Sequence, residues 1–374
     1  MVQKKVRIEY ITLSRALAII LITLLHALTR SFRVHSGTQT EFYSIPLYMT
    51  IIKAGIYGVS RIGLCIFLMI TGALMLPRNY SKTEEIKRFF THNWLTLFIT
   101  TEIWYVIMFW FKQTAPGSIL LEHGLKSCLL SFLSTICFIN PVTMETMWYM
   151  PVILCAYLMI PVFAVALKHI PNKYLILPCG IVIIGSFVIP ILNGILVGTG
   201  SPVYLEFKFD SAHLFSMYMI YILAGYFIND GYLDRIKSRY LIIIGCFFIA
   251  LFCGLQMWMW STEFEYLFGQ YEKDIFLLIS SVCLFALLKR IPISSAVAKI
   301  SEKLAEISFG IYFIHICILA CLSVIMKRYL PQITYLNKFV ILETVSFFGS
   351  ILIIQLLRKN KILAKYLLGI RNNS

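Results

Sequence analysis

Two side chains capable of chemistry lie in one apolar stretch near the N-terminus, SRALAIILITLLHALTR at positions 14–30. Arg15 and His26 are eleven residues apart, so on a helix they project from the same face, about 16 Å apart along its axis. An imidazole can act as a base near neutral pH, and a guanidinium group binds phosphate well. The structural alternatives are an arginine whose charged end reaches lipid headgroups and a histidine that only bonds to a neighbour.

Other polar and aromatic side chains lie within or at the ends of apolar stretches. They are Arg61 in GVSRIGLCIFLMITGALML, Glu145, Trp148 and Tyr149 in METMWYMPVILCAYLMIP, and Tyr312 and His315 in EISFGIYFIHICIL. Ionisable residues in such surroundings favour a functional reading. Trp148 and Tyr149 also suit an aromatic belt, and His315 also suits a hydrogen bond between helices. Thr71 and Gly72 favour close helix packing.

The elements that must position these side chains are membrane helices. Of the 374 residues, 59% are hydrophobic and only 14% are charged, which is outside the usage of soluble globular domains. Apolar runs of about 17–22 residues are long enough to cross ~30 Å of hydrocarbon as helices. Ten such spans are predicted: 8–29, 55–76, 94–111, 147–167, 174–197, 213–229, 240–260, 275–288, 305–326 and 339–357.

One segment is ambiguous, and no segment resembles a soluble domain. The stretch 118–139 contains LLSFLSTICFI, which is apolar but short for a crossing, so we interpret it as a re-entrant or interfacial helix. The longest polar stretches, about 30–54 and 112–146, are too short for an independent core. We therefore predict that residues 1–374 form a single transmembrane domain.

The distribution of positive charge predicts the orientation. If the N-terminus is cytoplasmic, the inner segments hold 21 Lys and Arg residues and the outer segments hold 10. Cytoplasmic loops of membrane proteins carry such an excess. Ten crossings with both termini in the cytoplasm are thus expected.

The net charge and the cysteines indicate neither a nucleic-acid partner nor a metal site. The formal charge of +15 is explained by this topology, so no nucleic-acid partner is inferred, although the basic inner face suits anionic lipid headgroups. The ten cysteines lie mostly in apolar spans without paired spacing. They are interpreted as small buried hydrophobes, and no metal site is predicted.

Taken in order, these motifs resemble the membrane-bound acyltransferase-3 family. The resemblance rests on SRALAIILITLLHA, FLMITGALML, WYMPVILCAYLMIP and SFGIYFIH, and it covers nearly the whole chain. The family's motif arginine and histidine map to Arg15 and His26. This sequence departs from the family in IKRFFTHNWL, where Lys87 and Arg88 are followed by histidine and asparagine instead of a larger basic cluster, and in Thr71, where the motif usually has serine.

The resemblance implies a multi-pass enzyme of the plasma or inner membrane. Such an enzyme transfers an acyl group, usually acetyl from cytoplasmic acetyl-CoA, to a hydroxyl of a cell-surface polysaccharide or its lipid-linked precursor. His26 would then be the base, or would itself accept the acyl group before passing it on. Arg61 would stabilise the negative charge on the thioester oxygen.

The other candidate residues would serve the two substrates. Arg15 would hold the pyrophosphate or pantetheine of the donor, and Lys87 and Arg88 would contact its nucleotide end. The acceptor side would include Glu145, Trp148 and Tyr149, with Tyr312 and His315 as further candidates near the reacting group. No bound cofactor is expected besides acyl-CoA as donor substrate.

An exporter or flippase for polysaccharide or lipid-linked sugar is the main alternative. In that case the intramembrane arginine and histidine would line a pathway, and the glycan would move without covalent change. The sequence leaves open the acyl group, the acceptor sugar and the oligomeric state.

Overall fold

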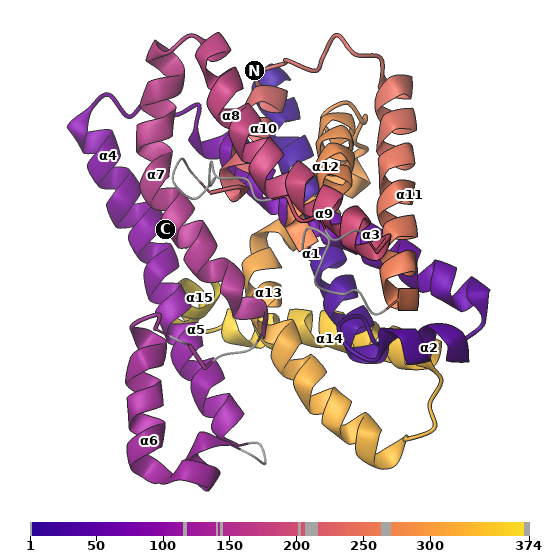
Figure 1. Cartoon of the computed structure of the whole chain (residues 1–374). Coiled ribbons are helices and arrows are strands. Elements are labelled where there is room, and N and C mark those ends of the chain that lie inside the picture. The colour runs from indigo at the N-terminus through magenta and orange to yellow at the C-terminus, as the bar shows by residue number, and fades with distance from the viewer. Residues whose placement is uncertain are drawn as a thin grey trace.

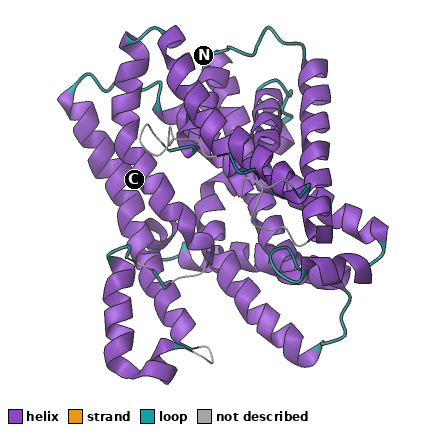
Figure 2. Cartoon of the chain, in the orientation of Figure 1, coloured by secondary structure: helices purple, strands orange, loops and turns teal. Residues whose placement is uncertain are grey.

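The computed structural model describes residues 2–114, 118–139, 141–142, 145–200, 203–205, 216–262 and 271–369. Within these ranges the regular structure is helical, and Figure 2 draws no strand there. The α-helices are α1 Val2–Ser31, α2 Thr38–Ser44, α3 Leu47–Met75, α4 Thr83–Phe89, α5 Leu95–Gln113, α6 Ile119–Ile136, α7 Tyr149–His169, α8 Ile176–Ile183, α9 Ile189–Gly198, α10 Tyr218–Asn229, α11 Ser238–Thr262, α12 Ile275–Leu288, α13 Ser295–Tyr329, α14 Tyr335–Leu357 and α15 Lys361–Leu368. Short helical turns are η1 Phe90–Trp94, η2 Glu145–Trp148, η3 Asn172–Leu175, η4 Ile184–Val188 and η6 Tyr271–Lys273.

The prediction of an all-helical, multi-pass membrane protein is confirmed. In the described ranges, nine helical segments are long and apolar enough to cross a membrane, and eight of them coincide with predicted spans. The predicted spans 213–229 and 275–288 correspond to the shorter apolar helices α10 and α12. Positions 213–215 lie outside the described residues.

The ninth long segment is α6, the ambiguous stretch of the sequence. Its 18 residues reach the length of a crossing. The backbone of Gly124, at φ 75° and ψ 178°, kinks the helix near its start, a conformation that glycine adopts readily. By length and composition α6 is suited to cross, so the re-entrant or interfacial placement stays a prediction.

Two of the long helical segments contain a π-turn. The turn η1 joins α4 to α5 without a break, so the predicted span 94–111 is the second half of a longer helix. The turn η4 lies between α8 and α9 and ends two residues before Pro190. Proline has no amide hydrogen to donate to the carbonyl four residues earlier, which explains the irregular turn at that place.

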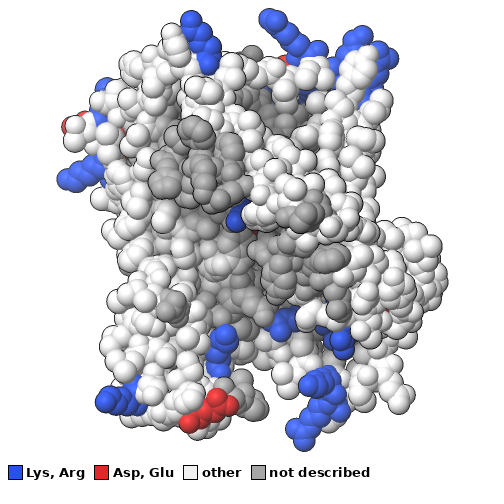
Figure 3. Space-filling view, viewed as in Figure 1, with Lys and Arg blue, Asp and Glu red and all other residues white. Residues whose placement is uncertain are grey.

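On one face of the molecule, charged side chains are concentrated toward its two ends. On the face drawn in Figure 3, Lys and Arg gather toward the top and bottom of the bundle, and a broad band between them is almost free of charge. This distribution suits a protein whose middle lies in hydrocarbon. The cytoplasmic location of both termini remains a prediction.

The core is built around α1 and α3. Helix α1 packs against α3 and α13, and α3 also packs against α10. At the α3–α10 contact, a Cβ on Gly72 would collide with the Ile222 carbonyl, and a Cβ on Gly225 would collide with the Met69 carbonyl. The close packing predicted at Gly72 is therefore present, and it allows the two backbones to touch.

A buried ion pair fixes the corner between α1, α2 and α3. The Lys53 ammonium lies 2.9 Å from the Glu41 carboxylate, and both side chains are 1% exposed. Lys53 also donates to the Arg33 carbonyl at 2.6 Å, and the Arg33 amide donates to Glu41 at 2.9 Å. The Lys53 ammonium lies 3.9 Å from the centre of the Trp260 ring on α11. The end of α1 is thereby tied to α2, α3 and α11.

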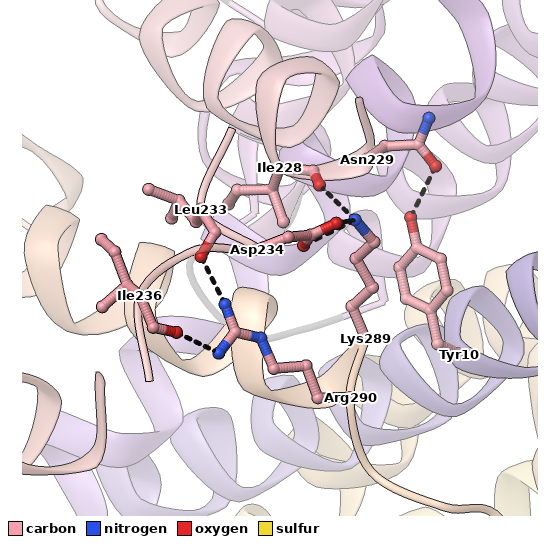
Figure 4. A network of polar contacts seen from close by, with 8 residues as sticks. All are labelled: Tyr10, Ile228, Asn229, Leu233, Asp234, Ile236, Lys289 and Arg290. Carbon is pink, nitrogen blue, oxygen red and sulfur yellow. Dashed lines mark hydrogen bonds and ion pairs between the residues drawn. The ribbon is translucent and has the colours of Figure 1, made fainter. Parts of the chain in front are cut away.

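A second network fastens the turn between α10 and α11 to the end of α12 (Figure 4). Lys289 donates to both carboxylate oxygens of Asp234 at 2.9 Å and to the Ile228 carbonyl at 3.0 Å. Arg290 donates to the carbonyls of Leu233 and Ile236. These bonds satisfy carbonyls that a turn would otherwise leave without partners.

The start of α12 gives a prediction about pH. Asp274 is 1% exposed and accepts the amide hydrogens of Phe276 at 2.7 Å and Leu277 at 3.1 Å. Burial raises the pKa of Asp274 from 3.8 to about 6. The folded protein therefore binds more protons than the unfolded chain between these two values, so this group's contribution to stability falls as pH rises through the window and is constant above it.

The variant Asp274→Asn tests this sign, because asparagine keeps an N-cap acceptor and does not titrate. We expect the melting temperature of the variant, relative to the natural protein in the same detergent, to rise between pH 4.5 and pH 7.5. A difference that is the same at both pH values would contradict the assignment.

Candidate active site

A pair of histidines joins the first helix to α13. The Nδ1 atom of His26 lies 2.9 Å from Nε2 of His315, and the two rings stack with centroids 5.1 Å apart. His315 is fully buried, and its Nδ1 lies 2.7 Å from the Ile311 carbonyl. These two residues, which the sequence separates by 289 positions, are thus in direct contact.

The hydrogen-bond pattern assigns a tautomer to each ring. A carbonyl oxygen can only accept, so Nδ1 of His315 carries the hydrogen and its Nε2 is the acceptor when the ring is neutral. His26 must then donate from Nδ1, which leaves the lone pair on its Nε2. The pair therefore presents Nε2 of His26 as a base, and His315 fixes the orientation of that ring.

A cavity of about 370 Å³ lies one helical turn before this pair. Its lining includes Ile22 on α1 and Tyr312 on α13. Ile22 precedes His26 by four residues and Tyr312 precedes His315 by three, a rise of about 6 Å and 4.5 Å. Helices α3, α5 and α7 supply most of the remaining wall.

Arg15 lies on the same cavity, farther from the histidines. It lines the wall together with Glu306 of α13. Glu306 is paired with Arg358. Within the described part of the chain, no ion pair joins Arg15 to a carboxylate, so its guanidinium faces the cavity without a fixed counter-ion. The predicted pair of Arg15 and His26 does lie along one face of α1.

Two polar residues to which the sequence analysis gives no role line the cavity together with Arg15. Lys87 and Arg88 belong to the exposed side of α4 and do not line the cavity. His92 and Asn93 do line it, and both lie in the π-turn η1. A π-turn inserts an extra residue into a helix and is frequent at functional sites. The sequence signal for these two lining residues is the polar pair HN in IKRFFTHNWL, which the sequence analysis interprets only as a departure from the family pattern.

The aromatic candidates divide between the cavity and the surface. Tyr149 and Tyr312 line the cavity, with ring centroids 6.2 Å apart. The Tyr312 hydroxyl donates to the Thr146 carbonyl. Trp148 is 43% exposed, and its ring centroid lies 6.0 Å from that of Tyr218. Glu145 begins η2, and its side chain lies outside the described part of the structure.

Arg61 lies in a separate buried cluster. Its guanidinium donates to the Tyr57 hydroxyl at 2.8 Å and lies 3.5 Å from the Glu272 carboxylate. Burial raises the pKa of Glu272, and the Arg61 guanidinium opposes this shift. Arg61 does not line the cavity, so its role at the thioester oxygen stays a prediction.

One intramembrane carboxyl next to the histidine pair was not assigned from the sequence. Thr23, three residues before His26, bonds through its hydroxyl to Glu343 of α14 at 2.8 Å. The second oxygen of Glu343 is buried without a hydrogen-bond partner among the described residues. This contact holds α14 against the part of α1 that carries His26.

One comparison with known proteins gave a match. A family model described as an acyltransferase domain matches residues 8–358. Neither the curated proteins nor the solved structures gave a match. The family match spans α1 through α14, and it includes both histidines and the arginine at the cavity. The chain therefore belongs to the acyltransferase 3 family.

Proposed function

We propose that this membrane acyltransferase transfers an acyl group, acetyl in the simplest case, from cytoplasmic acyl-CoA to a hydroxyl of a cell-surface polysaccharide or its lipid-linked precursor. The observation that carries the proposal is the bonded pair of His26 and His315, which lies about one helical turn beyond the lining of a cavity that Arg15 also lines. A base, an anion-binding group and a cavity between them are what a thioester donor requires.

In the proposed step, Nε2 of His26 takes the proton of the acceptor hydroxyl. The oxygen forms a bond to the thioester carbonyl carbon, the carbon–sulfur bond breaks, and the CoA thiolate takes the proton from Nε2 of His26 and leaves as the thiol. The imidazolium formed at His26 keeps donating from Nδ1 to His315, whose neutral Nε2 stabilises the positive charge. Transfer through an acyl-histidine would use the same atom as nucleophile.

The separation of Arg15 and His26 along α1 suits the arm of the donor. The eleven residues from Arg15 to His26 correspond to about 16 Å of helix rise, which is comparable to an extended pantetheine. Arg15 would bind the phosphate end of that arm, and His92 and Asn93 line the same cavity. Lys87 and Arg88 on the exposed side of α4 are placed to attract the nucleotide.

The acceptor side is proposed to use the exposed Trp148, because sugar rings stack on aromatic faces. With both termini in the cytoplasm, α1 enters from the inside and His26 lies toward the outer end. A donor bound from the cytoplasm would then serve an acceptor that faces outward.

The test compares cells that contain the protein with cells that lack it. We expect base-labile acyl esters on the surface glycan, seen by NMR with and without mild alkali, only when the protein is present, while the amount of glycan is unchanged. An exporter would give the opposite result, in which the glycan is lost and the ester pattern of what remains is unchanged.

The role of Arg15 is tested through the donor. Charge-assisted hydrogen bonds contribute about 1.5–3 kcal/mol, so we expect Arg15→Ala to raise the apparent KM for acetyl-CoA by about 10- to 100-fold, measured as release of free thiol in membranes. The exposed Arg235 provides a matched control, and Arg235→Ala should leave KM unchanged. An unchanged KM in Arg15→Ala would remove Arg15 from the donor site.

A further inference from the structure

The last of the helices that the structure describes returns to the wall of the cavity. Helix α15 packs against α5, α13 and α14, and Figure 1 shows it, in yellow, beside α5. The Asn360 side chain accepts the amide hydrogens of Ile362 at 2.9 Å and Leu363 at 3.3 Å and so caps the start of the helix. Gly369, at φ 64°, ends it.

Specific contacts hold α15 in this place. The Trp104 indole on α5 donates to the Leu367 carbonyl at 2.8 Å, which satisfies one of the carbonyls left free at a helix end. The Trp104 ring stacks on Phe313 of α13, with centroids 4.9 Å apart. The ion pair between Arg358 and Glu306 fixes the chain just before α15.

The end of α15 contributes side-chain and backbone surface to the cavity. Leu368 is 1% exposed, and both it and Gly369 line the cavity. A Cβ placed on Gly310 would lie 2.8 Å from Leu368, so Leu368 lies against α13 at that residue. Gly310 precedes His315 by five residues, which corresponds to about 7.5 Å along the helix.

Leu368 therefore lies between Arg15 and the histidines. Helices α1 and α13 run in the same direction, because Arg15 shares the cavity with the earlier residues Ala305 and Ser308 and His26 meets the later His315. The position level with Arg15 on α13 is about eleven residues before His315. Leu368 lies about halfway along this interval, and because the α13 residues that line the cavity run only from Ala305 to Tyr312, it lies in the half of the cavity nearer the base.

We propose that Leu368 is a specificity-determining residue that limits the size of the acyl group. This inference rests on the proposed function, in which the thioester end of the donor points toward His26. An isobutyl side chain at this wall fills space that the carbon chain of a longer acyl group would need. Leu368→Ala removes three carbon atoms from this wall. A butyryl group has two more carbon atoms than an acetyl group, so the space that is freed is enough for them.

The experiment measures thiol release from acetyl-CoA, propionyl-CoA and butyryl-CoA in membranes that carry the full-length protein. One methylene group in a fitted pocket changes selectivity by about 10-fold or more. We expect Leu368→Ala to raise the butyryl-to-acetyl ratio of kcat/KM by at least about 10-fold. Leu368→Val should raise this ratio less, and it keeps the test valid if Leu368→Ala fails to fold. Leu367→Ala is the matched control, because Leu367 is the preceding residue on the same helix and does not line the cavity.

The outcomes separate the two proposals. If the natural protein transfers none of the three acyl groups, the proposed function itself fails. If it is active but the leucine variants show the same ratio as Leu367→Ala, or lose all three activities in equal proportion, Leu368 is a structural residue and the inference is wrong.

Discussion

Replacing His26 with alanine is expected to lower acyl transfer by about 10³-fold, the middle of the range for removal of a general base. The bonded pair gives the reason, because Nε2 of His26 is left with a lone pair while Nδ1 is held by His315. The measurement is the rate of thiol release from acetyl-CoA in membranes, together with the ester content of the surface glycan. The amount of protein in the membrane should be unchanged.

Two further variants make this prediction specific. His315→Phe removes the acceptor for Nδ1 of His26 and should lower kcat by about 10- to 100-fold, as expected when a partner that orients a catalytic ring is lost. His169 is an exposed histidine at the end of α7, and His169→Ala should have full activity. Activity of His26→Ala within about threefold of the natural protein would refute the assignment of the base.

The second large effect is expected on stability, at the corner of α1, α2 and α3. Glu41→Ala leaves the Lys53 ammonium, which is 1% exposed, without its carboxylate. Removing one partner of a buried ion pair lowers the free energy of unfolding by about 3–5 kcal/mol. A clear fall in the melting temperature of the protein in detergent would show it.

A surface pair in the same chain provides the comparison. Glu122 and His123 lie 3.9 Å apart, with side chains 57% and 64% exposed, and such pairs contribute about 0–1 kcal/mol. Glu122→Ala should therefore have the same melting temperature as the natural protein. The double variant Glu41→Leu with Lys53→Met, which removes both charges, should recover part of the loss. Equal melting temperatures for Glu41→Ala and Glu122→Ala would contradict this account.

The sequence was most informative where the relevant geometry is local. The separation of Arg15 and His26 predicts one shared face because helix periodicity depends only on neighbouring residues. Both side chains accordingly lie along the side of α1 that faces the cavity and α13. Hydrophobic runs likewise located most spans, since length and composition decide whether a helix can cross.

Contacts between distant segments could not be predicted in this way. Nothing local to EISFGIYFIH indicates that His315 bonds to a residue on the first helix, because that contact depends on how α1 and α13 pack. The Arg61 pairing with Glu272 is similar, since Glu272 lies in a short turn before α12. The π-turn that brings His92 to the cavity has no composition signal of its own.

The histidine pair also has a consequence for synthesis. Its two members come from α1 and α13, and Leu368 of α15 contributes to the cavity wall. A ribosome-bound chain that ends before α13 contains His26 but lacks the partner that orients it. The pair of histidines and the cavity wall are therefore assembled only after α13 and α15 have been translated and inserted, so chains that end before α13 are not expected to transfer acyl groups.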